Sequence, residues 1–423
     1  MRRVLLAPVL AAVLFQVARA DDWNQFRGPN RDAVWGEKDL LETFPPEGVK
    51  IRWRVPVGGG YSSPVVVQGR VYLAYSEWKG SQAWEHLRCF DEPTGETRWT
   101  YSYEVGYDPS WREGNSRDGP RATPTIHQGK LYQIGADGDL FCLDACKGAV
   151  LWKKPLRDEY GLGDHRCITP SPLIEGDLLI LILGGKPNAG VVAFDKNTGK
   201  EVWRALEGRW TYCSPIIVDA GGKRQLIVLT VLAVTSLDPL SGNTYWREPC
   251  DLANGPSLVA TPVVQGHRLL ASGMMFQLDA EKPAAKLLWP DSPAAARRVL
   301  SSTSMPLMQG DYVYSERQNG LLVCLDARTG KQVWKNDKLT GIGGGATLHL
   351  MPNGDDVWIF TDQGDLIRAR LSPEGVQALA RAHVLDPTNP FGSRKVVWAP
   401  PAFANRHFFA RNEREMVCAS LAK

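Results

Sequence analysis

The chain has 423 residues, with 49 Lys and Arg against 46 Asp and Glu, and its formal net charge at pH 7 is +3. Three of the basic residues, Arg2, Arg3 and Arg19, lie within the first twenty positions, so the rest of the chain is neutral. This balance provides no bulk attraction to nucleic acid or to anionic membranes, and we expect neither as a partner.

Residues 1–20 have the pattern of a secretory signal peptide. Two arginines precede the apolar segment 4–17, and Ala18-Arg19-Ala20 matches an A-x-A cleavage site. The apolar run is shorter than the ~20 residues that span a bilayer, and no later segment reaches ~18 uninterrupted apolar residues. We therefore predict cleavage near Ala20, a periplasmic or secreted location, and a monomeric mature chain without a transmembrane segment.

Residues 21–50 form an arm without a repeat motif, and the sequence does not assign its role. The strand pattern 51–55 follows, with Trp53 at its centre. From there to the C-terminus the chain is built of repeats, so the expected organisation is signal peptide 1–20, arm 21–50 and one repeat domain 51–423.

Two motifs alternate along the repeat domain. The first is a small residue and Pro, followed by alternating apolar residues and a Gly turn, as at Ser63-Pro64 and Ser214-Pro215. It occurs eight times, twice in weak form. The second is Asp-x-x-x-Gly-x-x-x-Trp, clear at 91–99, 195–203 and 326–334 and degenerate at 144–152, 238–246 and 279–289. Recurrence at about 45 residues indicates one supersecondary unit copied along a solenoid or around a ring.

Each unit is predicted to contain four short strands. Pro opens the first strand, where its missing N–H is tolerated best. The Gly turn makes a hairpin, and the Asp and Gly of the second motif form the turn into a fourth strand that carries Trp. One segment, 373–383, is predicted as a short helix.

The counts at the two ends predict a closed ring. Clear Trp strands follow only six of the eight first strands, the eighth unit ends without a fourth strand, and the strand around Trp53 has no unit of its own. We therefore predict an all-β fold, a single eight-bladed β-propeller of four-stranded blades whose last blade is closed by the N-terminal strand. A large flat side chain suits the space between blades. The predicted inter-blade residues are Trp53, Trp99, Trp152, Trp203, Trp246, Trp289 and Trp334.

The eight cysteines fall into two groups. Cys89, Cys142, Cys324 and Cys418 each lie just before the Asp position of their repeat, which favours a role as small buried apolar residues. The others have no common repeat position, and one disulfide among them stays open. They are Cys146, Cys167, Cys213 and Cys250.

The repeat is best represented by residues 192–203, with the sequence VAFDKNTGKEVW. It resembles the tryptophan-docking repeats of the pyrroloquinoline quinone (PQQ) propellers. The resemblance covers about nine-tenths of the mature chain, and the arm segment 23–32 is similar to the opening of many exported PQQ-like proteins. One branch of this superfamily, the quinoprotein dehydrogenases, implies PQQ and calcium on the propeller axis. The other, the assembly factor BamB, implies a scaffold without a cofactor.

Four features that the dehydrogenase resemblance implies are missing from the sequence. The chain has no adjacent cysteine pair, no Cys-x-x-Cys-His haem motif, no calcium-loop spacing and no large insertions. We therefore expect no metal site, no cofactor and no catalytic residue. The favoured function is a non-catalytic exported scaffold that binds a protein or glycan partner, with a role in cell-envelope assembly. The alternative is a PQQ- and calcium-dependent dehydrogenase acting on alcohols or sugars.

A partner site is expected at the channel mouth, on the loops that precede the first strands and on those between second and third strands. Arg beside Trp and Tyr is a common composition of surfaces that bind carboxylates, sugars or peptides. The alternative is that these side chains only anchor the loops on the rim. The candidate residues are Trp111, Arg112, Arg121, His165, Arg166, Trp210, Tyr212, Arg317 and Trp398.

Overall fold

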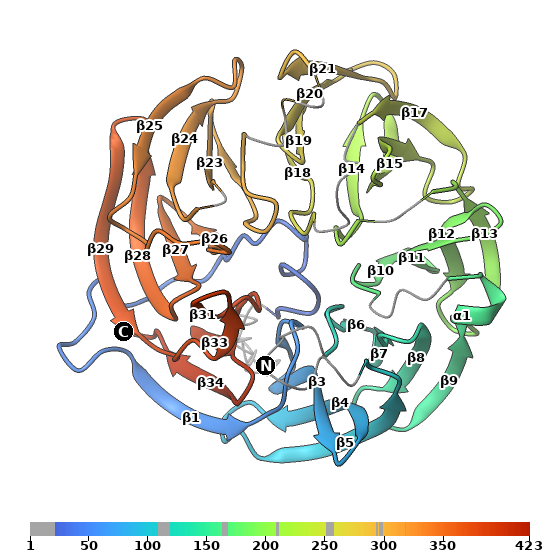
Figure 1. Ribbon diagram of the computed structural model, residues 1–423, viewed down its shortest axis with the longest axis horizontal. Helices are drawn as coiled ribbons and strands as arrows, with labels where there is room; N and C mark the ends of the chain where they lie inside the picture. The colour runs from blue at the N-terminus through green and yellow to red at the C-terminus, as the bar shows by residue number, and fades with distance from the viewer. Residues whose placement is uncertain are drawn as a thin grey trace, which may run out of the picture.

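Eight four-stranded antiparallel sheets are arranged as the blades of one ring (Figure 1). The computed structural model describes residues 22–108, 119–162, 168–208, 211–250, 258–292, 295, 299–317 and 319–423. The predicted signal peptide lies outside the described residues. The predicted all-β eight-bladed propeller is confirmed.

The first four blades follow one another in the chain, each beginning at its innermost strand. Blade 1 consists of β2 (Val65–Val67), β3 (Arg70–Lys79), β4 (Gln82–Asp91) and β5 (Thr97–Val105). Blade 2 consists of β6 (Thr125–His127), β7 (Lys130–Ile134), β8 (Asp139–Asp144) and β9 (Val150–Pro155), and α1 (Leu156–Glu159) follows it. Blade 3 consists of β10 (Leu173–Glu175), β11 (Leu178–Gly185), β12 (Ala189–Asp195) and β13 (Glu201–Ala205). Blade 4 consists of β14 (Ile216–Ala220), β15 (Lys223–Leu229), β16 (Ala233–Leu237) and β17 (Thr244–Pro249).

The second half of the ring repeats this order up to the last blade. Blade 5 consists of β18 (Val263–Gln265), β19 (Arg268–Ala271), β20 (Met274–Leu278) and β21 (Ala285–Trp289). Blade 6 consists of β22 (Leu307–Gln309), β23 (Tyr312–Glu316), β24 (Leu322–Asp326) and β25 (Gln332–Asn336). Blade 7 consists of β26 (Leu348–Asn353), β27 (Asp356–Thr361), β28 (Asp365–Ser372) and β29 (Gly375–His383). A short hairpin of β30 (Asn389–Phe391) and β31 (Arg394–Val396) precedes blade 8, which has β32 (Ala402–Ala404), β33 (His407–Arg411), β34 (Glu415–Ser420) and β1 (Lys50–Pro56).

The ring is closed by the N-terminal strand, as predicted. β1 pairs antiparallel with β34, from Lys50 opposite Ser420 to Pro56 opposite Glu415. The pairing has a bulge between Ile51 and Trp53, and a bulge of this kind turns the extra residue out of the regular pleat. The first and last segments of the propeller therefore share one sheet.

The prediction of a short helix at 373–383 is wrong. Residues Gly375–His383 form β29, which pairs with β28 from Asp365 opposite His383 to Ser372 opposite Gly375. The segment is rich in helix-forming Ala, Gln and Arg, but the free edge of β28 supplies backbone partners along its whole length. Pairing and burial outweigh a helix propensity worth only tenths of a kcal/mol per residue. Blade 7 is therefore complete without a tryptophan strand.

The tryptophans contact the next blade around the ring. The Trp99 ring lies against the turn of blade 2, where a Cβ added at Gly148 would be 2.5 Å from it. In the same way the Trp53 ring lies against Gly95 of blade 1, whose positive φ of 75° suits glycine. The indole N–H groups of five tryptophans also donate to backbone oxygens of the next blade, at 2.8 to 3.1 Å. These are Trp53, Trp99, Trp203, Trp289 and Trp334.

Two tryptophans depart from this arrangement. Trp246 Nε1 donates to Gln225 in its own blade, at 2.8 Å, although its ring still approaches Phe276 of blade 5. The ring of Trp152 packs on Gly199 of blade 3, but its Nε1 is buried without a hydrogen-bond partner.

The small-residue and Pro motif forms a hydrogen-bonded belt around the channel. In successive blades the backbone N–H just before the proline donates to the side chain at the same position of the next blade. The N–H of Ser63 donates to the side chain of Thr123, and the series continues in the same way through Ser171, Ser214 and Thr261 to the sulfur of Met305. The donor–acceptor distances are 2.9 to 3.1 Å. The belt lies at the start of the innermost strands and fixes their spacing around the axis.

The two faces of the ring differ. The turn face carries the Asp-x-x-x-Gly turns and the hairpin turns between first and second strands. The loop face carries the connections from each outermost strand to the next blade, and the belt lies toward it. Cys89, Cys142, Cys324 and Cys418 are buried free thiols between these faces, as predicted, whereas Cys146 is an exposed free thiol.

Candidate functional site

The N-terminal arm occupies the centre of the ring. In Figure 1 the blue segment before β1 crosses the middle of the propeller. Trp23 forms a bridge with Val66 of blade 1, and Asn24 exchanges hydrogen bonds with Ile126 of blade 2. The contacts of the arm continue to the remaining blades, so residues of the chain itself lie along the axis.

Apolar side chains of the arm pack against the second half of the ring. Phe26 lies against Ala260 and Met305, next to the innermost strands of blades 5 and 6. Trp35 is 1% exposed and packs between Trp358 of blade 7 and Phe403 of blade 8, with ring centroids 5.8 and 4.9 Å away. Sequence alone left the arm without a position, because its strand partners are far away in the chain, from 43 residues for Trp23 and Val66 to 323 residues for Trp35 and Trp358.

Two buried arginines of the arm are held differently. Arg31 donates to the backbone oxygens of Ser171, Pro172 and Pro215, which join it to the belt in blades 3 and 4. Among the described residues, Arg27 donates to the Asp32 oxygen at 3.3 Å, and its Nε and Nη1 are buried without a partner there. Burial lowers the pKa of both, to about 9 for Arg31 and about 10 for Arg27, and both stay cationic at neutral pH.

Three predicted site residues meet at the mouth of the channel on the loop face. The guanidinium of Arg121 lies 5.2 Å from the centroid of the Tyr212 ring and 5.4 Å from that of Tyr61. Tyr61 in turn lies 6.0 Å from Trp398, which donates from Nε1 to the Gly345 oxygen. All four are half-buried. A partly exposed Arg between aromatic rings can bind a carboxylate or a peptide backbone at this mouth.

One repeat position supplies these four residues. Tyr61, Arg121, Tyr212 and Trp398 each lie three residues before the proline that opens a first strand. Sequence reasoning missed Tyr61, and the shared position is the signal that identifies it. The other candidates Trp111, Arg112, His165, Arg166 and Trp210 lie outside the described residues.

Arg317 lies apart from this cluster, next to a buried acidic pair between blades 6 and 7. Its neighbour Glu316 is fully buried, accepts from Ser304 at 2.6 Å, and has one carboxylate oxygen without a partner. Asp362 is 1% exposed, accepts from Arg394 at 2.7 Å, and also has one unpartnered oxygen. Burial raises the pKa of Glu316 to about 7 and that of Asp362 to about 6. Glu316 and Asp362 were missed because neither lies in a motif.

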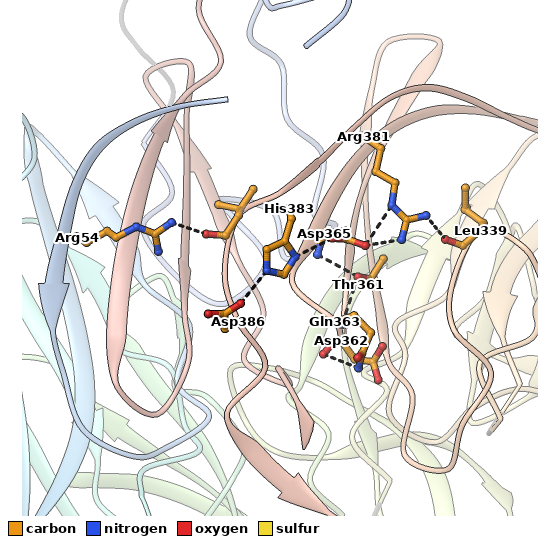
Figure 2. Close-up of polar contacts among 10 residues, drawn as sticks. Arg54, Leu339, Thr361, Asp362, Gln363, Asp365, Arg381, His383 and Asp386 are labelled. Atoms are coloured by element: carbon orange, nitrogen blue, oxygen red, sulfur yellow. Dashed lines mark hydrogen bonds and ion pairs between the residues drawn. The ribbon is translucent and has the colours of Figure 1, made fainter. Parts of the chain in front are cut away.

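A second polar network lies at the rim of blade 7 (Figure 2). His383 lies between two carboxylates, with Nδ1 2.9 Å from Asp365 and Nε2 3.0 Å from Asp386. Arg381 also binds Asp365, and it donates to the Leu339 oxygen at 3.2 Å. Burial alone would lower the pKa of His383, but its hydrogen bonds to the two carboxylates raise it. This network links β28 and β29 to the neighbouring loops at Leu339 and Asp386, so we interpret its role as structural.

The described residues do not fit a calcium ion with PQQ. Across the described ranges, no three His, Cys, Asp or Glu side chains gather as a metal site would require. Hard cations such as calcium need six to eight oxygen ligands. In the described part of the chain no helix is long and apolar enough to cross a membrane.

A ring of eight four-stranded blades with tryptophans docked between them defines the class as a PQQ-like propeller. The chain belongs to the family described as outer membrane protein assembly factor BamB, which matches residues 83–336 and 278–369. BamB of Burkholderia pseudomallei is 25% identical over 331 residues, covering 73% of this chain and 74% of the relative. The structure of BamB from Moraxella catarrhalis has a TM-score of 0.59 at 18% identity, covering 88% and 97% of the two chains.

Quinoprotein dehydrogenases are also similar. Quinohemoprotein alcohol dehydrogenase of Comamonas testosteroni is 24% identical over 193 residues, which are 44% of this chain and only 26% of the dehydrogenase. Its structure has a TM-score of 0.66 at 15% identity, covering 95% of this chain and 80% of that chain. At such identities the structural similarities show the fold alone.

Proposed function

We propose that this protein is an exported, non-catalytic propeller scaffold that binds a protein partner in assembly of the cell envelope. Membership of the BamB family supports the proposal. The sequence pattern of residues 1–20 supports export to the periplasm. Scaffolds of this kind need a rigid frame and a recognition surface, and no reaction chemistry.

The observation that carries the proposal is the position of the N-terminal arm on the axis. The resemblance to the dehydrogenases places PQQ on the propeller axis, but here Trp23, Phe26, Arg31 and Trp35 occupy it and contact the innermost strands. The arm stabilises the ring from inside. Binding is then left to the outer surfaces, and the loop face offers the arginine and aromatic cluster at its mouth.

The mouth suits a peptide segment of a partner better than a glycan. Arg121 presents a half-buried guanidinium between Tyr61 and Tyr212, which favours an acidic or carboxylate group. Trp398 is fixed by its hydrogen bond to Gly345 and by Phe391, whose ring centroid is 5.0 Å away. Rigid aromatic and arginine residues are typical centres of protein interfaces.

The test is affinity capture from envelope extracts of the source cells. A variant with Arg121, Arg166 and Trp398 all changed to Ala should lose its partner, while a variant with Lys200→Ala and Lys331→Ala on the turn face should keep it. Thermal melting of both variants checks that they fold. If the first variant alone loses an envelope protein, the proposal is supported. If both variants still bind that protein, the site lies at a blade edge instead. Recovery of glycans instead would identify the other partner class.

The similarity to quinoprotein dehydrogenases gives the second candidate, an oxidation of alcohols or sugars with PQQ and calcium. It is tested by incubating the purified protein with both and measuring dye-linked oxidation of alcohols and aldoses. Turnover would refute the scaffold. Absence of both PQQ retention and turnover would refute the enzyme.

A further inference from the structure

A pocket of about 330 Å³ lies on the turn face, at the seam where blade 8 meets blade 1. Blade 8 contributes Asn405 and His407 from one hairpin and Arg52 from β1. Blade 1 contributes Gly69 and the turn at Glu92 and Pro93. Arg52 is the extra residue of the bulge in β1, which turns its side chain toward this seam.

The pocket contains a buried carboxylate that pairs with no Lys or Arg among the described residues. Glu92 is 7% exposed, and both of its carboxylate oxygens accept from Asn405 Nδ2 at 2.7 Å. The nearest ionisable donor is His407, with Nδ1 3.9 Å from Glu92. Burial lowers the pKa of His407 and raises that of Glu92. His407 is therefore neutral at pH 7, and a buried carboxylate of this kind is stabilised by an ammonium group.

The start of the arm leads directly to this pocket. The Asp22 carboxylate accepts from the backbone N–H of Gln68 at 3.0 Å, and the next residue, Gly69, lines the pocket. The Asp22 carboxylate is also close enough to contribute to the raised pKa of Glu92. Cleavage after Ala20 would make Asp21 the first residue, one position from this anchor and within ~4 Å of it along the chain. Asp21 itself lies outside the described residues.

We propose that the pocket binds the chain's own N-terminus after removal of the leader, with the α-ammonium of Asp21 on Glu92 and the Asp21 carboxylate on Arg52. The charges match, because an N-terminal Asp carries one cation and one anion, and the pocket has one acid at its floor and one base at its rim. Within the described chain Arg52 has no ion-pair partner that would compete. Processing would then lock the seam that closes the ring. The proposal rests on cleavage after Ala20 and is independent of the proposed partner.

The first experiment identifies the terminus and its reactivity. Intact mass of the exported protein should show a chain that begins at Asp21. An activated ester at pH 7 should then acylate the α-amine about tenfold more slowly in the folded than in the unfolded protein, because an ion pair that raises its pKa by one unit leaves a tenth of the free base. Another mature terminus, or equal rates, would overturn the proposal.

Variants distinguish the pocket from simple burial of the terminus. Glu92→Gln should restore fast acylation, while Glu96→Gln, an exposed change in the same turn, should leave it slow. A chain with one Ser added before Asp21 shifts the ammonium by ~3.8 Å and should react fast and melt at a lower temperature. The extended chain therefore tests the proposal even if Glu92→Gln does not fold. Slow acylation of the extended chain would refute the proposal.

Discussion

The indole N–H of Trp53 donates a 2.8 Å hydrogen bond to the backbone oxygen of Glu92. Trp53 belongs to β1 at the outer edge of blade 8, and Glu92 belongs to the turn of blade 1. The contact therefore joins the last blade to the first. Closure of the ring depends on this docked tryptophan together with the pairing of β1 and β34.

Trp53→Phe should lower the free energy of unfolding by about 2–3 kcal/mol. The change removes part of the ring packed on Gly95 and leaves the Glu92 oxygen without its buried donor, and each loss costs about 1–2 kcal/mol. Urea denaturation followed by circular dichroism measures the difference. Trp152→Phe is the matched control and should cost about 1 kcal/mol less, because Trp152 Nε1 has no partner to lose. Equal losses would contradict the role of the hydrogen bond.

Arg31→Met should destabilise the protein by about 3 kcal/mol. The guanidinium of Arg31 joins carbonyl groups of blades 3 and 4, and charged hydrogen bonds of this kind contribute about 1.5–3 kcal/mol. Arg27→Met should cost less than half as much, because two of the Arg27 nitrogen atoms make no hydrogen bond. Thermal or urea denaturation of the pair tests this order. A larger loss for Arg27→Met would mean that the two arginines hold the arm in another way.

Thr123→Val should destabilise the belt by about 1–3 kcal/mol, since it leaves the buried N–H of Ser63 without an acceptor at almost unchanged side-chain volume. Thr123 is 1% exposed, so water cannot replace the hydroxyl. Thr100→Val, on the exposed face of β5, serves as the control and should change stability by less than about 0.5 kcal/mol. A belt that tolerates Thr123→Val would show that packing alone spaces the inner strands.

Glu316 should make stability fall as pH rises. Burial raises its folded pKa to about 7, above its unfolded value near 4.3, so the folded state favours the protonated acid. This contribution is complete below about pH 4 and is lost as pH rises through 7, and it amounts to about 3–4 kcal/mol. Glu316→Gln should therefore flatten the melting temperature between pH 5 and 8 and raise it at pH 8.

Glu96→Gln is the control for this pH dependence, because Glu96 is exposed and its change should leave the profile as in the parent protein. Asp362 titrates in the same direction, with a pKa of about 6, so a smaller slope near pH 5 to 7 should persist in Glu316→Gln. A profile that is unchanged by Glu316→Gln would place the titration elsewhere.

Local patterns were enough to predict most of the fold. The turn chemistry of Asp91 and Gly95 repeats along the chain, and a count of repeats against Trp strands predicted that β1 completes blade 8. The same local reasoning failed at Gly375–His383, where propensity favoured helix and the edge of β28 decided for strand. At the mouth, Arg121, Tyr212 and Trp398 were predicted together with residues that the structure does not describe, and Arg317 lies beside a different cluster.

The sequence by itself determined the number of blades, the strand that closes the ring and the residues that recur at each seam, because these depend on short motifs that every blade repeats. Only the tertiary structure decided where the arm lies, that Glu316 comes close to Asp362, and that Asp22 lies beside the Glu92 pocket. Each of these depends on particular contacts between segments that are far apart in the chain. Such contacts have no period, and they exist only after the blades have folded and packed against one another in the ring.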